Sequence, residues 1–236
     1  MAMRPCARRT PPRVSEPPLP FAGLTGAGVR IAVVDSGIHA EHPHIEAMRL
    51  APGIAIAPDG TIESGAEATR DRLGHGTAVA AAIQEKASGS TLLPVRVFRD
   101  TLKTSAAALV AAIRWAVAQE VDLINLSLGS PNAAHEQVFA RAADEAAQAG
   151  ILILSAREAN DAPCWPGALP QVLGIRLDWE WPRAGYRPDG NGFAASGYPR
   201  PIPRVPQQRN LYGISFAVAQ MSGFAALAVE HLGAPP

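Results

Sequence analysis

Three side chains of this sequence are of the types that together perform nucleophilic catalysis. Asp35 directly follows an apolar run, His75 lies between two glycines, and Ser215 directly precedes the long apolar run 216–232. A serine hydroxyl becomes a strong nucleophile when an imidazole accepts its proton, and a carboxylate behind the imidazole fixes its tautomer. Each residue also has a more ordinary interpretation taken alone. Asp35 could be a turn residue, His75 a structural histidine and Ser215 a helix N-cap.

Longer strings around these residues resemble one known family, the subtilisin-like serine peptidases. The serine motif of that family reads Gly-Thr-Ser-x-Ala-x-Pro, and here Ile214 replaces the threonine and Ala219 replaces the proline. The resemblance extends over about residues 26–230. The matching strings are Gly74-His75-Gly76-Thr77-Ala78-Val79-Ala80, Asn125-Leu126-Ser127-Leu128-Gly129 and Gly213-Ile214-Ser215-Phe216-Ala217.

The resemblance implies a role for each of these residues. The order aspartate, histidine, serine along the chain is the order in subtilisins. It implies that Ser215 is the nucleophile, His75 the general base and then acid, and Asp35 the carboxylate that orients His75. It also implies that Ser127-Leu128-Gly129 pairs with a peptide or protein substrate in extended conformation through backbone hydrogen bonds. The predicted function is a serine endopeptidase that acts through an acyl-enzyme intermediate.

The oxyanion hole departs from the family pattern. Counted from Gly150 without gaps, Ala159 occupies the position of the expected asparagine, and Asn160 arrives one residue late. Asn160 is therefore assigned as the oxyanion donor on the condition that the loop accommodates one extra residue. Arg157 and Glu158 replace small residues near the expected wall of the specificity pocket. The alternative is a catalytically impaired pseudo-peptidase that binds extended peptides.

Elements able to position these residues alternate along the chain. Residues 29–34 form a continuous apolar, β-branched run, which is typical of a strand buried on both faces in a parallel sheet. Alternating strands and helices predict an α/β fold, a three-layer sandwich with a mainly parallel central sheet. A short hairpin is predicted around Asp59-Gly60, and the resemblance implies a cis bond between Trp165 and Pro166. Further strands are expected at 93–98, 121–126, 151–154 and 171–175, and helices at 77–86, 104–119, 134–149 and 216–232.

Composition limits the other functional classes. Lys+Arg and Asp+Glu are 21 each, so the net charge is zero and neither nucleic acid nor a membrane is expected as partner. No cofactor and no metal are expected, although His39, Glu41, His42 and His44 lie close together; a solvated or structural role is favoured for them. A nucleotide-binding α/β protein is the most distant alternative, because the glycines around residues 23–28 precede the first strand instead of following it.

The chain is expected to form one domain. Residues 1–20 hold several arginines and prolines and no apolar segment, so they are predicted to be a disordered arm and not a secretory signal. Residues 21–236 are predicted to be a single peptidase domain of a short intracellular type without a recognisable prodomain. The two cysteines, Cys6 and Cys164, do not form a disulfide framework, which favours a reducing, cytoplasmic location.

Overall fold

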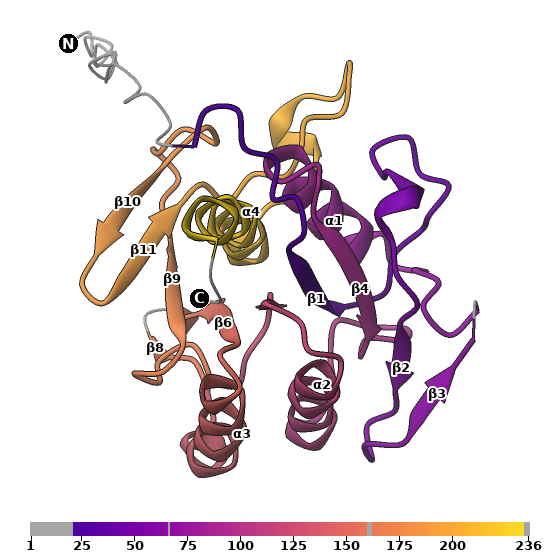
Figure 1. Cartoon of the computed structure of the whole chain (residues 1–236), viewed down its shortest axis with the longest axis vertical. Helices are drawn as coiled ribbons and strands as arrows, with labels where there is room; N and C mark the ends of the chain where they lie inside the picture. Colours follow the sequence, from indigo (N-terminus) through magenta and orange to yellow (C-terminus); the bar gives the residue numbers. More distant parts are fainter. Residues whose placement is uncertain (1–20, 66, 160–161, 234–236) are drawn as a thin grey trace, which may run out of the picture.

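The computed structural model describes residues 21–65, 67–159 and 162–233. A nine-stranded sheet lies at its centre, with two helices on each face (Figure 1). The strand order is β10-β11-β9-β6-β5-β1-β4-β2-β3. The strands of the sheet are β1 Arg30–Asp35, β2 Ile54–Ile56, β3 Ile62–Ser64, β4 Thr91–Arg96, β5 Leu123–Leu126, β6 Leu152–Ala156, β9 Leu173–Leu177, β10 Tyr186–Asp189 and β11 Gly192–Ala195.

The sheet is parallel except at its two ends. The pairs β10–β11 and β2–β3 are antiparallel, and every other neighbouring pair is parallel. The β2–β3 pair is the hairpin predicted around Asp59-Gly60. A separate two-stranded ribbon joins β7, Glu158–Ala159, to β8, Ala162–Pro163. The predicted fold class, a three-layer α/β sandwich with a mainly parallel sheet, is confirmed.

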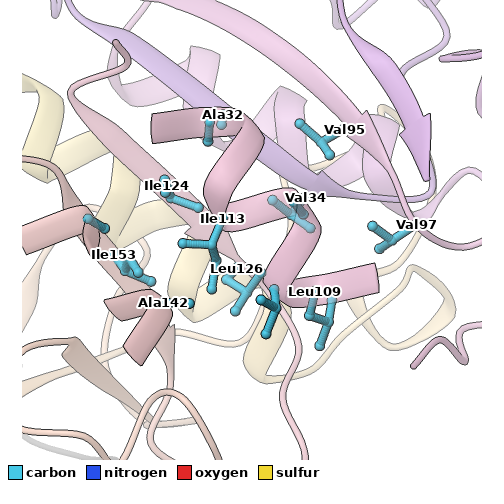
Figure 2. Close-up of a cluster of buried hydrophobic side chains, with 14 of the residues drawn as sticks. Ala32, Val34, Val95, Val97, Leu109, Ile113, Ile124, Leu126, Ala142 and Ile153 are labelled. Atoms are coloured by element: carbon cyan, nitrogen blue, oxygen red, sulfur yellow. The ribbon is translucent and has the colours of Figure 1, made fainter. Parts of the chain in front are cut away.

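Two hydrophobic clusters hold the layers together. On one face of the sheet lie α2, Ala106–Ala118, and α3, Glu136–Gln148; on the other lie α1, His75–Lys86, and α4, Ile214–Leu232. Ala32 and Val34 of β1 enter one cluster, and Ile31 and Val33 enter the other. All four side chains are buried. The continuous apolar run of this strand follows from burial on both faces. Figure 2 shows the cluster beneath α2 and α3, to which Ala32 and Val34 of β1 contribute together with Ile113 and Leu109 of α2.

The strand order reverses at β1, and this point locates the site. After β1 the chain forms β2, β3 and β4, which all lie on one side of β1 in the sheet, and then β5, which lies on the other side of β1. Open parallel sheets bind ligands at the carboxyl ends of strands beside such a reversal. Asp35 is the last residue of β1 and therefore lies there. Among the described residues, no helix combines the length and apolar character that crossing a bilayer requires.

Candidate active site

Asp35 and His75 form the centre of the site. The Oδ1 atom of Asp35 lies 2.7 Å from Nδ1 of His75, and the Asp35 side chain is fully buried. Oδ1 also accepts the backbone N–H of Ser36 at 2.8 Å, so Asp35 does cap its own turn, as its ordinary interpretation predicted. The two interpretations are compatible because a single carboxylate oxygen accepts from both groups.

The turn after β1 fixes the start of α1, on which His75 is the first residue. The Gly76 N–H donates to Ser36 Oγ at 2.8 Å. A β-carbon added to Gly76 would lie 2.2 Å from the carbonyl oxygen of Gly37, so the helix can approach this turn so closely only with glycine there. This contact places the imidazole over the carboxylate.

Asp71 is a second buried carboxylate that organises the same helix start, and sequence reasoning gave it no role. It accepts hydrogen bonds from Ser36 Oγ, from the N–H groups of Leu73 and Gly74, and from both the N–H and the hydroxyl of Thr77, at 2.6–2.9 Å. It thus satisfies N–H groups that a helix end leaves unpaired. The sequence signal that could have indicated this role is an aspartate four residues before His75, the first residue of α1.

The protonation of His75 reflects these two carboxylates. Burial lowers its pKa, but the hydrogen bond and charge of Asp35, together with the charge of Asp71, outweigh burial and raise the pKa of His75 above its ordinary value of 6.5. The carboxylates therefore strengthen the imidazole as a base.

Ser215 lies on the first turn of α4. Its interpretation as an N-cap is wrong, because Gly213 occupies that position. The ring of Phe216, the next residue, lies beside the His75 ring with centroids 5.6 Å apart. The Ser215 hydroxyl donates to the backbone carbonyl of Ser127 at 3.1 Å, and among the described residues it forms no hydrogen bond to His75.

The segment Ser127-Leu128-Gly129 follows β5 and reaches the serine. Ser127 Oγ accepts from the Asn125 amide at 2.9 Å and lies 3.4 Å from the Ser215 carbonyl. A β-carbon on Gly129 would lie 2.6 Å from Cys164 Sγ and 2.7 Å from the Trp165 carbonyl. The segment therefore packs flat against the loop that carries the Trp165–Pro166 bond, and that bond is cis, as predicted.

The predicted oxyanion donor, Asn160, lies outside the described residues. The structure does describe Arg157 and Glu158, the two charged residues shortly before it. Glu158 forms an ion pair with Arg176 at 2.8 Å, and Arg157 donates to the Asp189 carbonyl at 3.3 Å. Both side chains are therefore engaged with β9 and the β10–β11 turn. Among the described residues, no three His, Cys, Asp or Glu side chains are placed to hold a metal ion.

Comparisons with known proteins bear on the family and the fold. A family model described as the subtilase family matches residues 26–170. The chain therefore belongs to the subtilase family. Among curated relatives, the subtilisin of Bacillus pumilus is 29% identical over 153 residues, which is 61% of this chain and 52% of that protein. The subtilisin-like protease SBT6.1 of Arabidopsis thaliana is 30% identical over 165 residues, 65% of this chain but 15% of that protein.

Solved structures support the fold. A psychrophilic protease, S41, has a TM-score of 0.69 and 23% identity, covering 89% of this chain and 79% of that one. A lanthipeptide protease has a TM-score of 0.66 and 22% identity, covering 88% and 76%. The chain spans less than two thirds of the length of the two curated relatives described above. The family match ends before Ser215, so the assignment of the serine depends on its motif and its position.

Proposed function

We propose that the chain is a serine endopeptidase in which Ser215, His75 and Asp35 act as the catalytic triad. The observation that carries the proposal is the 2.7 Å contact between the buried Asp35 carboxylate and His75, with Ser215 on the helix turn beside the same imidazole. A carboxylate paired with one imidazole nitrogen leaves the other nitrogen free to accept a proton from a serine hydroxyl.

In the proposed reaction, an extended peptide pairs with the backbone of Ser127-Leu128-Gly129. Ser215 Oγ attacks the peptide carbonyl carbon, and its proton passes to His75 Nε2 and then to the departing amine. Water, activated by the same nitrogen, hydrolyses the resulting ester. The Ser215 N–H at the start of α4 and the side chain of Asn160 are the proposed donors to the oxyanion.

The hydroxyl of Ser215 must turn away from Ser127 before it can react. A substrate that pairs with this segment needs the Ser127 carbonyl for its own N–H, so its binding would displace the hydroxyl toward His75. Hydrogen bonds at catalytic groups are often misaligned before substrate binds. The observed arrangement is therefore compatible with a competent enzyme.

Labelling with a fluorophosphonate tests the proposal. Wild type should be labelled at Ser215, and Ser215→Ala and His75→Ala should be labelled weakly or not at all. Ser222→Ala is a matched control, because Ser222 lies on the same helix and donates to Asn125 at 3.0 Å, away from His75. Equal labelling of the wild type and the triad variants would refute the proposal.

The second candidate is a pseudo-peptidase that binds extended peptides. The hydrogen bond from Ser215 to Ser127 in place of one to His75 favours it, as does the displaced asparagine. In that case wild type would resist fluorophosphonate, yet would bind a peptide with an affinity that Ser215→Ala leaves unchanged.

A further inference from the structure

A cavity of about 420 Å³ lies next to the proposed triad. Its walls come from three segments: the turn at residues 39–44 after β1, the start of α1, and the loop at 199–211 that leads to Ser215. In Figure 1 the gold segment before α4 lies beside α1, which is where this cavity forms. It shares the start of α1 with the site already described but has its own lining.

The lining is rich in cationic and basic side chains. Three arginines and three histidines contribute to it, and they come from stretches far apart in the sequence. These residues are Arg70, Arg72, Arg200, His39, His42 and His44.

The acids near the cavity are already engaged, except for Glu41, which is exposed on the 39–44 turn and does not line the cavity. Asp71, which also lines it, accepts five hydrogen bonds from its own loop and helix. Glu67 pairs with Arg70 at 3.6 Å, and Glu85, which is near Arg200, is paired with Arg183 and with Lys86. In the part of the chain that the structure describes, Arg72 and Arg200 form no ion pair with an acid.

Arg200 is held in place for binding. One guanidinium nitrogen donates to the His44 carbonyl at 3.2 Å, and the Arg200 carbonyl accepts from the Asn210 amide at 3.4 Å. A guanidinium has five N–H donors, so most of them remain for a ligand. Burial, then the charges of Arg200 and His42, lower the pKa of His44, which agrees with a positive potential in this cavity.

The position of the cavity indicates which part of a substrate it meets. Gly74 and Thr77, on either side of His75, line it, as does Leu211, shortly before Ser215. Ser127-Leu128-Gly129 does not line it. In the proposed function that segment holds the acyl part of the peptide. The cavity is lined by neighbours of His75 and Ser215, though by neither residue itself, and is therefore taken to receive the departing part.

We propose that this cavity is a subsite for an acidic side chain, aspartate or glutamate, in the leaving-group part of the peptide. Arg200 and Arg72 are the residues that select the charge, because a carboxylate gains charge-assisted hydrogen bonds from a guanidinium that a neutral amide does not. The proposal rests on the proposed function, since it takes Ser127-Leu128-Gly129 as the acyl side.

Acyl transfer to added amines tests the proposal directly. An N-acyl dipeptide ester forms the acyl-enzyme, which then partitions between water and a dipeptide amide that occupies the leaving-group side. Two matched pairs serve as nucleophiles: Glu-Ala-amide against Gln-Ala-amide, and Ala-Glu-amide against Ala-Gln-amide. At least one glutamate nucleophile should capture the acyl group about three- to tenfold better than its glutamine partner, consistent with a partly desolvated ion pair.

Variants identify the residues responsible. Arg200→Gln and Arg72→Gln should each reduce the glutamate-to-glutamine ratio toward one, while Arg200→Lys should retain part of it. Because the ratio is measured within one protein sample, partial misfolding of a variant does not alter it. Arg114→Gln is the matched control, since Arg114 lies on α2 and pairs with Glu145 at 2.8 Å, and it should keep the full ratio. Salt should weaken the preference by screening it.

A binding measurement separates failure of this inference from failure of the proposed function. Ser215→Ala, which cannot form an acyl-enzyme, is titrated with uncleaved octapeptides that carry glutamate or glutamine in the leaving-group half. Tighter binding of the glutamate peptides, lost in Ser215→Ala/Arg200→Gln, would support the subsite even if wild type proves inactive. Equal capture of both nucleophiles, or a ratio unchanged in both Arg200→Gln and Arg72→Gln, would overturn the inference, as would equal affinity for the two peptides.

Discussion

The Ser215 hydroxyl and the Ser127 carbonyl are joined by a hydrogen bond of 3.1 Å, although 88 residues separate them in sequence. The bond links the start of α4 to the end of β5, so the nucleophile and the backbone that would receive substrate share one carbonyl. The Ser127 carbonyl cannot accept a full-strength hydrogen bond from the Ser215 hydroxyl and from a substrate N–H at the same time. Substrate pairing and release of the hydroxyl toward His75 are therefore expected to be coupled.

The raised pKa of His75 predicts the pH dependence of activity. Catalysis needs the neutral imidazole, so kcat/KM should rise with pH through an apparent pKa above 6.5. Asp35→Asn should lower that apparent pKa and reduce kcat by about 10⁴. Asp144→Asn, at an exposed position on α3, should change neither value. An acid limb at or below pH 6.5 in wild type would contradict the prediction.

The same shift has a consequence for stability. A pKa raised in the folded state means that the protonated imidazole stabilises the fold, an effect fully present below the unfolded-state value of 6.5. The free energy of unfolding should therefore fall as pH rises from 6.5 through the folded-state pKa. Urea unfolding of Ser215→Ala, which avoids self-digestion, measures it, and Ser215→Ala/His75→Gln should lack this component.

Replacing Asp71 tests the organisation of the helix start. The amide of Asp71→Asn has one oxygen in place of two and carries no charge, so it cannot accept all five hydrogen bonds. The fold should therefore lose about 1–3 kcal/mol of stability. The acid limb of kcat/KM should also shift to lower pH, because the Asp71 charge helps to raise the pKa of His75. Asp59→Asn, at an exposed hairpin, should leave the acid limb unchanged. Stability loss without a shifted limb would limit Asp71 to a structural role.

Replacing Gly129 tests the backbone segment beside Ser127. In Gly129→Ala the new methyl group would overlap Cys164 Sγ and the Trp165 carbonyl, which would force the segment toward the substrate. We expect KM for extended peptides to rise and stability to fall by about 1–3 kcal/mol. Cys164→Ala in the same chain should restore part of the loss, because it removes the sulfur but not the carbonyl. Unchanged KM in Gly129→Ala would argue against pairing at this segment.

Replacing Asn160 tests the proposed oxyanion donor. Asn160→Ala should lower kcat by about 10²–10³ with little change in KM, since the donor acts mainly in the transition state. Asn160→Asp should be at least as harmful, because it directs a negative charge at the oxyanion. Asn191→Ala, on the exposed β10–β11 turn, is the control. Full kcat in Asn160→Ala would mean that another group supplies the donor.

The parts of the fold that could be predicted are those with a strong local pattern. The apolar run of β1 predicted burial on both faces, and the alternation of strands and helices predicted the mainly parallel sheet. The strand β10 was missed because Pro188 lies inside it. It lies at the edge of the sheet, where a strand tolerates a proline.

The parts of the site that could not be predicted depend on contacts between distant segments. Arg200, His44 and Arg72 belong to three separate stretches, and only the packing of the 199–211 loop against α1 brings them to one cavity. The histidines at 39–44 were expected to be solvated or structural, and nothing local indicated that they share a wall with arginines. The position of Asp71 shortly before α1 was a local signal for its hydrogen bonds to the helix start. No local signal indicated its hydrogen bond with Ser36, which is 35 residues away in sequence.

The last helix also secures the first described turn of the chain. Glu230, near the end of α4, accepts the N–H groups of Thr25 and Gly26 at 2.8 and 2.6 Å, across 205 and 204 residues. The helix α4 therefore carries Ser215 at its first turn and binds the turn at Thr25 and Gly26 near its last turn. Contacts of such long sequence separation form late and slowly during folding. During refolding, activity should consequently return at the rate of the slowest global phase. Peptide hydrolysis would then report when the complete domain has formed.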